Sequence, residues 1–232
     1  KWPEKPVKIV VPFAPGGSTD VVARPWVEKL TEAFGQQFII ENRGGAAGMI
    51  GMEGTAKAAP DGYTFACTPG ATLSIVPNLK SVPYDPFKSF APVGRVGDLI
   101  CGFTVHPSTG IKSMKELVEY AKKNPGKLAF GSAGLGTSTQ LRVEMLKFRA
   151  GVDILHVPYR GAPQALTDLM AGQVSMIWSD LRTAMPQVQA GKLKALAVTG
   201  RKRLALTPNI PTMIEQGFPD YELSNWVGAY LP

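Results

Sequence analysis

The sequence predicts an α/β fold that is divided between two lobes, each built around a parallel sheet. Short β-branched runs alternate with amphipathic segments along the chain, which is the pattern of βαβ units. A strand, a glycine-rich loop and a helix follow one another twice, at widely separated places in the chain. The 232 residues are enough for two lobes of about 100 residues each.

The first of these units occupies the first 35 residues. Val7–Val11 is a β-branched run that stops at the prolines and glycines of residues 12–17. Ser18 and Thr19 suit the start of a helix, and apolar residues then recur three and four positions apart. Those apolar residues are Val22, Trp26, Val27, Leu30 and Phe34. Gly35 follows as a helix-ending glycine, which completes the predicted order of strand, loop and helix.

The second unit begins with a short strand at 128–130 and a glycine-rich loop, Gly131–Ser138. The helix after this loop is predicted to place Leu141, Met145 and Phe148 on one face. The same pattern predicts strands at 38–40, 63–67, 156–158 and 174–178, and helices after residues 44–51 and 160–161. Strands therefore alternate with helices through both halves of the chain.

The lobe boundaries follow from two segments that are predicted to connect one lobe to the other. The proline-rich residues 82–92 and the strand Gly97–Val105 are predicted to pass from the first lobe to the second. Lys194–Thr199 is predicted to be the return strand. The resulting division assigns 1–100 and 200–232 to the first lobe, and 101–199 to the second.

Composition and charge exclude several classes of protein. The chain is 44% hydrophobic and 19% charged, and it has no apolar run of the roughly 18 residues that a membrane span requires. The net charge is +7, but the densest cationic cluster, Arg201–Arg203, has no interleaved aromatic residues, so we expect no nucleic-acid partner. His106 and His156 lack ligand-like neighbours, so neither a metal nor a cofactor is expected.

The cysteines and the first residues bear on the cellular compartment. Cys67 and Cys101 both lie in apolar, strand-like segments, and either two buried thiols or one disulfide fits that setting. The chain starts at Lys1 and soon enters a strand. If the protein is exported, we therefore expect that its signal peptide has been removed.

The two glycine-rich loops are suited to binding an anion. A helix N-terminus presents free backbone N–H groups at the positive end of the helix dipole, and glycine lets a ligand approach the main chain closely. Serine and threonine hydroxyls add further donors. Residues 15–19 or residues 131–138 alone are equally compatible with a tight turn before a helix. Together, in matching positions of two lobes, they favour a ligand site.

An enzyme is poorly supported by the same residues. Ser132 superficially resembles a nucleophile, but the Gly-x-Ser-x-Gly spacing is absent. His106 and His156 have no evident acidic partner in the sequence, which favours structural roles for both. We therefore predict a binding protein, with a hydrolase that uses Ser132 as a remote alternative.

Eight segments of the chain match the pattern of a known family in order and spacing: Pro12–Arg24 (PFAPGGSTDVVAR), Glu41–Gly51 (ENRGGAAGMIG), Ala58–Thr64 (AAPDGYT), Val82–Asp85 (VPYD), Gly131–Leu141 (GSAGLGTSTQL), His156–Gly161 (HVPYRG), Lys192–Thr199 (KLKALAVT) and Ile210–Gly217 (IPTMIEQG). Through them the chain resembles, almost end to end, the substrate-binding proteins of tripartite tricarboxylate transporters, also called Bug-type receptors.

The resemblance implies a periplasmic binding protein of type II, a Venus-flytrap receptor with a mixed, mostly parallel sheet in each lobe. Such a receptor captures a small organic anion, here expected to be a mono- or dicarboxylate, between its lobes. It delivers the acid to the membrane permease subunits of its transporter and acts as a periplasmic monomer. An alternative with the same cleft is a subunit that presents the ligand to a membrane sensor kinase.

The resemblance also implies which residues touch the ligand. The first-lobe contacts are Phe13, Ala14, Pro15, Gly16, Gly17, Ser18, Thr19 and Asp20. The second-lobe contacts are Ser132, Ala133, Gly134, Gly136, Thr137 and Ser138. The walls of the site are completed by Thr68, Gly70, Ala71, Thr72, Tyr159, Ser179 and Asp180.

Three departures from the family pattern stand out. Gln140 occupies a position where the family commonly has a histidine, and Ser179-Asp180 stands where Asp-Asn is frequent. Asp180 is compatible both with accepting a hydrogen bond from the ligand and with a purely structural role. The chain ends at Pro232, where the family normally continues, so we expect C-terminal elements of the first lobe to be missing.

Overall fold

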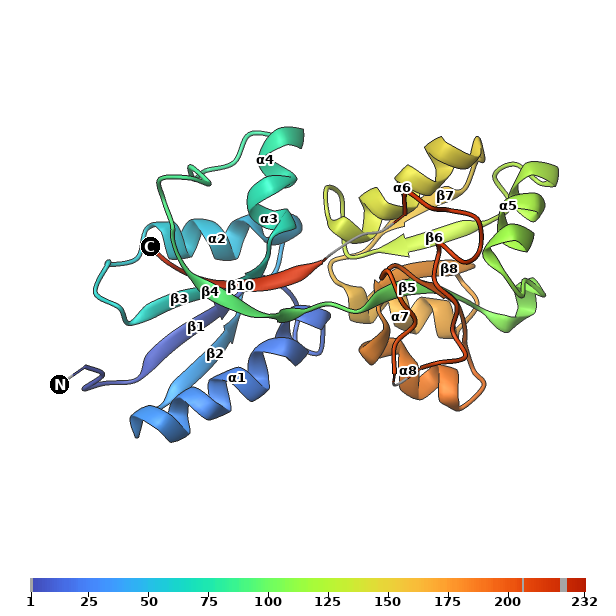
Figure 1. Cartoon of the computed structure of the whole chain (residues 1–232). Helices are drawn as coiled ribbons and strands as arrows, with labels where there is room; N and C mark the ends of the chain where they lie inside the picture. The colour runs from blue at the N-terminus through green and yellow to red at the C-terminus, as the bar shows by residue number, and fades with distance from the viewer. Residues whose placement is uncertain (1, 206, 222–224) are drawn as a thin grey trace. The chain divides into compact units, whose positions relative to one another are not determined.

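The computed structural model describes residues 2–205, 207–221 and 225–232, and it consists of two compact units (Figure 1). The first unit comprises Lys1–Leu99 and Asn225–Pro232, and the second comprises Ile100–Ser224. The chain thus passes from one unit to the other twice. No helix in the described part of the chain is both long and apolar enough to cross a membrane.

The first unit is a five-stranded sheet with helices. Its elements are β1 (Val7–Val11), α1 (Ser18–Phe34), β2 (Phe38–Asn42), η1 (Ala46–Gly48), α2 (Met49–Ala56), β3 (Thr64–Pro69), α3 (Ala71–Ser74), α4 (Val76–Leu79), β4 (Ala91–Asp98) and β10 (Trp226–Leu231). The strand order is β2-β1-β3-β10-β4. β1 pairs in parallel with β2 and β3, whereas β10 pairs antiparallel with β3 and β4. Four of the five strands therefore run in one direction.

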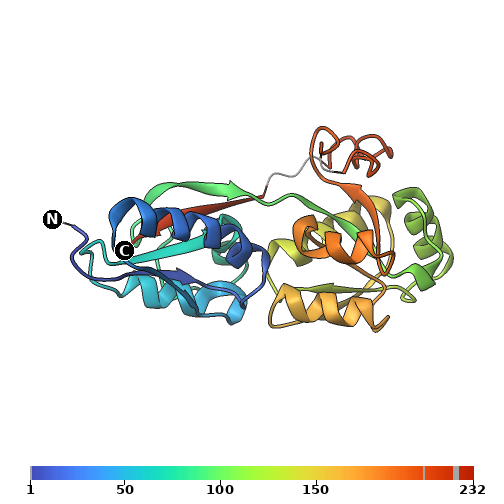
Figure 2. The ribbon, with the colours of Figure 1, turned by 90° about the horizontal axis from the view of Figure 1, so that it is seen from below.

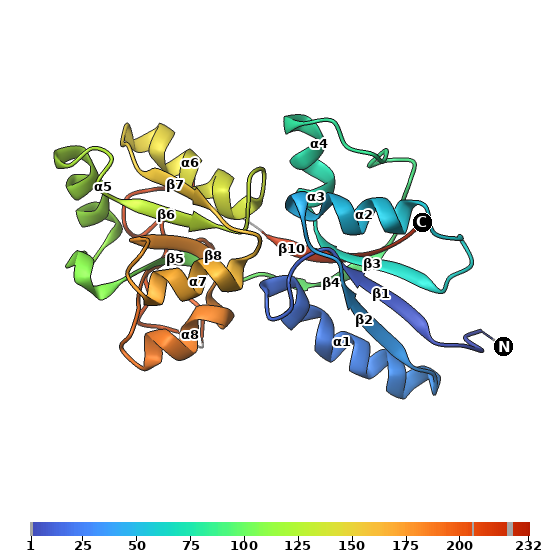
Figure 3. The same ribbon diagram turned by 180° about the vertical axis from the view of Figure 1, so that it is seen from behind.

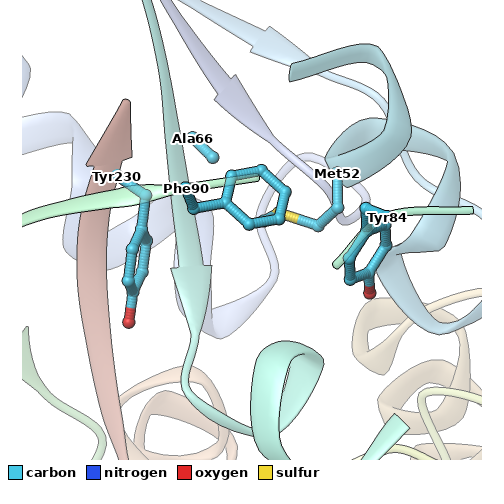
Figure 4. Close-up of a cluster of buried hydrophobic side chains, with 5 residues drawn as sticks. All are labelled: Met52, Ala66, Tyr84, Phe90 and Tyr230. Atoms are coloured by element: carbon cyan, nitrogen blue, oxygen red, sulfur yellow. The ribbon is translucent and has the colours of Figure 1, made fainter. Parts of the chain in front are cut away.

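Both faces of this sheet are covered. The crossover from β1 to β2 moves one way along the sheet and the crossover from β2 to β3 moves the other way, so right-handed connections place α1 and α2 on opposite faces (Figures 1 and 2). One core cluster joins α2 to the sheet and to the segment before β4 (Figure 4). Its buried residues are Met52, Ala66, Tyr84, Phe90 and Tyr230.

The second unit repeats this topology with different strands (Figure 3). Its elements are β5 (Cys101–Val105), η2 (Pro107–Thr109), α5 (Met114–Lys123), β6 (Ala129–Ser132), α6 (Ser138–Ala150), β7 (Leu155–Pro158), α7 (Ala162–Met170), β8 (Met176–Asp180), α8 (Leu181–Gln189) and β9 (Lys194–Val198). The strand order is β7-β6-β8-β5-β9, with β6 parallel to β7 and β8. β5 pairs antiparallel with β8 and β9. The predicted α/β class with mixed, mostly parallel sheets is confirmed.

The structure divides the chain differently from the sequence prediction. Residues 200–221 were assigned to the first lobe, but in their described part they pack on the second unit. The Met213 N–H donates to the Val198 carbonyl (2.9 Å), and the Gln216 side chain bonds the backbone of Met114 and Leu196. β9 is accordingly an edge strand of the second sheet, and β10 is the strand that returns to the first.

Two finer predictions also differ from the structure. The predicted strand Gly97–Val105 is split into the end of β4 and β5, which belong to different sheets. On α6 the buried apolar residues are Val143 and Leu146, and Phe148 is 88% exposed. Spacing on a helix identifies residues that share a face, but it does not tell which face meets the sheet.

The cysteines lie in separate units. Cys67 is in β3 and Cys101 is in β5, and both are buried thiols. Burial, and to a lesser extent the nearby Asp20 carboxylate, raise the pKa of the Cys67 thiol to about 12. Of the two possibilities that the sequence left open, the structure contains the thiols.

Candidate ligand-binding loops

The first glycine-rich loop lies at the carboxyl end of β1, where the order in which the chain adds strands reverses. Crossovers leave β1 toward β2 and return past it to β3, so this edge is the topological switch point of the unit. Gly16 has a φ of +74°, which favours glycine. Gly17 is the N-cap of α1 and offers no side chain to the first turn. The N-terminus of α1 is therefore open to an external acceptor.

Asp20 holds this loop in shape from inside. Its buried carboxylate accepts from the Gly16 N–H (2.9 Å), from Arg24 Nε (2.9 Å) and from Asn42 Nδ2 (3.1 Å). Burial alone would raise the pKa of Asp20, but the hydrogen bonds from Gly16, Arg24 and Asn42 outweigh it and hold the pKa below its usual value. Both carboxylate oxygens are thus engaged within the protein. Asp20, which the sequence analysis counted among the ligand contacts, fixes the loop that presents them.

Asn42 connects the loop to its neighbours, although the sequence analysis did not single it out. Its Nδ2 also donates to the Phe13 carbonyl (3.1 Å). The Phe13 ring and the Thr72 methyl both approach Gly48 so closely that a Cβ there would lie 3.2 Å from each. The loops after β1, β2 and β3 therefore meet at one edge of the first sheet. Asn42 falls within the sequence segment ENRGG, but nothing in that segment indicates that its side chain bonds Phe13 and Asp20.

The turn after β3 is tightly packed. Thr68 Oγ1 donates to Thr72 Oγ1 (3.0 Å), and the Tyr84 hydroxyl donates to the Thr72 carbonyl (3.0 Å). A Cβ on Gly70 would lie 2.5 Å from the Trp226 ring, so the close approach of that ring requires glycine. Ala71, partly buried, begins α3. These residues line the same edge as the first loop.

The second glycine-rich loop repeats the arrangement at the switch point between β6 and β8. Gly134 and Gly136 have φ values of +126° and +83°. Thr137 is the N-cap of α6, but its hydroxyl donates to the Gly134 carbonyl (2.7 Å) instead of capping the helix. The Ala133 N–H donates to Thr139 Oγ1 (2.8 Å). The N-terminus of α6, where Ser138 begins the helix, is likewise left without a side-chain cap.

Gln140 plays the part in this loop that Asp20 plays in the first. Its Oε1 accepts from the Gly136 N–H at 2.7 Å, four residues back, as Asp20 accepts from Gly16. The departure at Gln140 therefore affects how the loop is fixed. The acceptor is neutral here and charged in the first loop.

Ser132 and His156 form a pair that sequence reasoning did not foresee. Ser132 Oγ lies 2.6 Å from His156 Nε2 and accepts from the Gly134 N–H (3.1 Å). The imidazole stacks on Phe130 with ring centroids 4.6 Å apart. Burial lowers the pKa of His156, nearby Glu144 raises it and Lys147 lowers it, and the result lies below the usual value. The two residues are 24 positions apart, and the parallel pairing of β6 with β7 brings them together.

Tyr159 supports the second loop without turning its hydroxyl toward it. The hydroxyl donates to Asp168 Oδ2 (2.6 Å) on α7. Burial and this carboxylate raise the pKa of Tyr159 to about 12. Its backbone N–H donates to the Ser132 carbonyl (3.0 Å), which ties the segment before α7 to the end of β6. The N-cap of α7 is Gly161, which again carries no side chain.

The Asp180 carboxylate is engaged by Arg182 within the second unit. Its Oδ1 accepts from the Arg182 N–H (2.9 Å), which caps α8, and its Oδ2 pairs with Arg182 Nη2 (2.7 Å). Hydrogen bonding to this carboxylate raises the pKa of Arg182. The neighbouring Ser179 hydroxyl is buried and has no hydrogen-bond partner among the described residues. Of the two residues, Ser179 is the one whose hydrogen-bonding capacity is unused.

The helix caps separate two groups of helices. Side chains of Ser113 and Asp180 close the N-termini of α5 and α8. The helices α1, α6 and α7, which begin at the sequence-predicted loops, have no side-chain cap, and neither do the shorter helices α2, α3 and α4. An anion that accepts their free N–H groups would be favoured by the helix dipole. The predicted contacts thus gather at the switch-point edges of the two sheets, with Asp20 and Asp180 engaged internally.

Comparison with known proteins gives one matching family and several similar structures. The family model described as "Tripartite tricarboxylate transporter family receptor" matches residues 22–232. The periplasmic binding protein BugD is 39% identical with a TM-score of 0.94, over the whole chain and 77% of the BugD chain. Rpa4515 of R. palustris, solved with adipate, is 35% identical with a TM-score of 0.96, over the whole chain and 78% of its own. MatC of Rhodopseudomonas palustris, solved with malate, is 31% identical with a TM-score of 0.92, over the whole chain and 79% of its own.

These similarities confirm the expectation of a receptor in place of an enzyme, because the family and its solved members are solute-binding proteins. They also confirm the type of fold that the resemblance implied. The chain belongs to the receptors of the tripartite tricarboxylate transporter family.

Proposed function

We propose that the protein is a periplasmic receptor for a small organic anion, a mono- or dicarboxylate, which it delivers to the membrane permease subunits of a tripartite transporter. The observation that carries the proposal is the repeated turn before α1 and α6, in which a left-handed glycine precedes an uncapped helix. A carboxylate supplies the acceptors that such helix ends lack. Adipate and malate, the acids in two of the similar structures, are both dicarboxylates.

In this proposal each unit contributes a carboxylate-binding loop. Backbone N–H groups in the first turns of α1 and α6 donate to carboxylate oxygens, and the hydroxyls of Ser18 and Ser138 are available nearby. Ser132 and Thr137 use their hydroxyls to shape the second loop. The glycines allow the main chain itself to meet the ligand, so a carboxylate at a helix end needs no cationic side chain beside it.

A melting screen over mono-, di- and aromatic carboxylates tests this function. A true ligand stabilises the folded protein by about 2.7 kcal/mol at a concentration 100 times its dissociation constant. Titration calorimetry on the acids that shift the melt then gives their affinities. If no carboxylate shifts the melting temperature, the proposal of an organic-acid receptor is overturned.

The role in transport needs a separate experiment, because a receptor that serves a sensor kinase would bind the same acid. We propose the transport role from membership of the family. Deletion of the protein is expected to abolish uptake of the acid and to leave acid-induced transcription intact. Loss of the transcriptional response with normal uptake would favour the sensory role.

A further inference from the structure

Arg142 is a partly buried cation that has no counter-ion among the residues the structure describes. It lies in the second turn of α6, and its Nε is buried without a hydrogen-bond partner. No carboxylate in the described part of the chain lies within ion-pair distance of it. The partly buried Arg182 offers a contrast, because its guanidinium pairs with Asp180. Arg149, about two turns further along α6, donates to the Asp220 carbonyl (2.9 Å).

The position of Arg142 places it near the second glycine-rich loop. It follows Ser138 by four residues, so the two lie on one face of α6, and helical side chains lean toward the N-terminus. The guanidinium interacts electrostatically with Cys101 and Tyr221. Cys101 pairs with Asp180 at the carboxyl end of β8, which runs parallel to β6. Arg142 therefore lies at the sheet edge from which the loop 133–137 emerges.

This placement is unfavourable for the protein alone. The buried Nε has lost hydration that no hydrogen bond within the described residues replaces, and the guanidinium charge has no counter-ion among those residues. Burial lowers the pKa of Arg142, while Tyr221 and Cys101 raise it, and the pKa lies below its usual value. An arginine nevertheless stays charged near neutral pH. A bound anion would remove both penalties at once.

We propose that Arg142 is a specificity-determining residue that offers its guanidinium to a carboxylate of the bound acid and thereby favours dicarboxylates over monocarboxylates. The inference rests on the proposed function of these loops. A helix end supplies only about half a positive charge, which suits one carboxylate. A full guanidinium charge supplies what a second carboxylate requires.

The test compares adipate with hexanoate, two acids of equal chain length, by titration calorimetry. Arg142→Gln is expected to weaken adipate binding about 10- to 100-fold, the usual effect of losing a charge-assisted hydrogen bond. Hexanoate binding is expected to change less than threefold. The same variant is expected to raise the melting temperature without ligand by about 2–4 °C, because an uncompensated buried charge is gone. Arg142→Lys, which keeps the charge, is expected to retain part of the preference.

Arg149→Gln is the matched control, since it removes a charge from the same helix. It is expected to lower the melting temperature slightly and to leave the ratio of the two affinities unchanged. If Arg142→Gln lowers the melting temperature and leaves that ratio as in the wild type, Arg142 is structural and the inference is overturned. If the wild-type protein binds neither adipate nor any other carboxylate, the proposed function itself fails, which is a separate outcome.

Discussion

The loops that precede α1 and α6 share the turn next to the N-cap but are fixed by different chemistry. In both, a glycine with positive φ precedes the N-cap, and its N–H donates to the side chain four residues on. The N-cap N–H donates three residues back in both, from Gly17 to Ala14 (3.2 Å) and from Thr137 to Gly134 (3.3 Å). Only the acceptor differs, since one is a carboxylate and the other a carboxamide.

The difference in charge explains the surroundings of the two loops. A buried carboxylate requires compensation, and Arg24 and Asn42 supply it around Asp20. Gln140 carries no charge and so needs no counter-ion, and its Oε1 accepts one hydrogen bond from the Gly136 N–H. The first loop is therefore anchored to β2 through Asp20 and Asn42, whereas the second is tied to β7 through Ser132, which accepts from the Gly134 N–H and contacts His156.

Replacing the two acceptors should expose this contrast most strongly. Asp20→Ala leaves the Gly16 N–H and the Asn42 amide without their partner, whereas Arg24 is exposed enough to be rehydrated. We expect a loss of about 2–4 kcal/mol of unfolding free energy. Gln140→Ala should cost only about 1 kcal/mol. Urea denaturation of both variants measures the difference, and equal losses would show that the charge is irrelevant.

Substitution of Gly134, in the second glycine-rich loop, should have the next largest effect. Gly134 has a φ of +126°, and a Cβ there would lie 3.2 Å from the Tyr159 carbonyl oxygen. Gly134→Val should therefore cost about 1–3 kcal/mol of stability and abolish detectable acid binding. Gly151→Val, at a helix end with open space around it, is the control that should leave binding intact. Normal calorimetric affinity in Gly134→Val would remove this loop from the ligand site.

Acid should weaken the first loop selectively. The folded-state pKa of Asp20 is lowered, so its contribution to stability is full above the unfolded pKa of about 3.9 and is lost as the pH falls through the folded value. Asp20→Asn should be less stable at neutral pH and lose less stability between about pH 5 and pH 2. Thermal melts across this range measure the slopes. Parallel slopes for both proteins would contradict the assignment.

The smallest expected effect comes from adding a negative charge to the second loop. Gln140→Glu keeps an oxygen that can accept from the Gly136 N–H but adds a negative charge without the arginine four residues on that Asp20 has in Arg24. The helix dipole should stabilise the free protein by about 0.3–1 kcal/mol. The same charge should repel an anionic ligand and weaken its binding about three- to tenfold. Tighter binding of the acid would mean that the loop is not an anion site.

Local patterns allowed much of the fold and of the loops to be predicted from the sequence. The order of β1, glycine loop and α1 follows from β-branched residues, glycines and helical spacing within the first 35 residues. The loop before α6 follows in the same way. Both depend on interactions over a few residues, where sequence and structure correspond closely.

Features that depend on tertiary register could not be predicted. The pairing of Ser132 with His156 requires β6 and β7 to align, and the engagement of Asp20 by Asn42 requires β1 and β2 to align. The assignment of residues 200–221 depends on polar contacts such as those of Gln216, in a stretch without strand or helix periodicity. The lack of a counter-ion for Arg142 among the described residues is likewise a property of its surroundings, which no spacing encodes.

The uncapped helix ends have a consequence for motion. A side-chain cap is part of the chain and always present, but an anion at α1 or α6 is a cap that can leave. Without it, the first turns of these helices lose a stabilising contact worth about 1 kcal/mol and should fray, whereas α5 and α8 keep Ser113 and Asp180. The amides of Ser18 and Ser138 should then exchange faster with solvent in the empty protein. Binding of the acid would supply the N-terminal caps that side chains do not provide in α1 and α6.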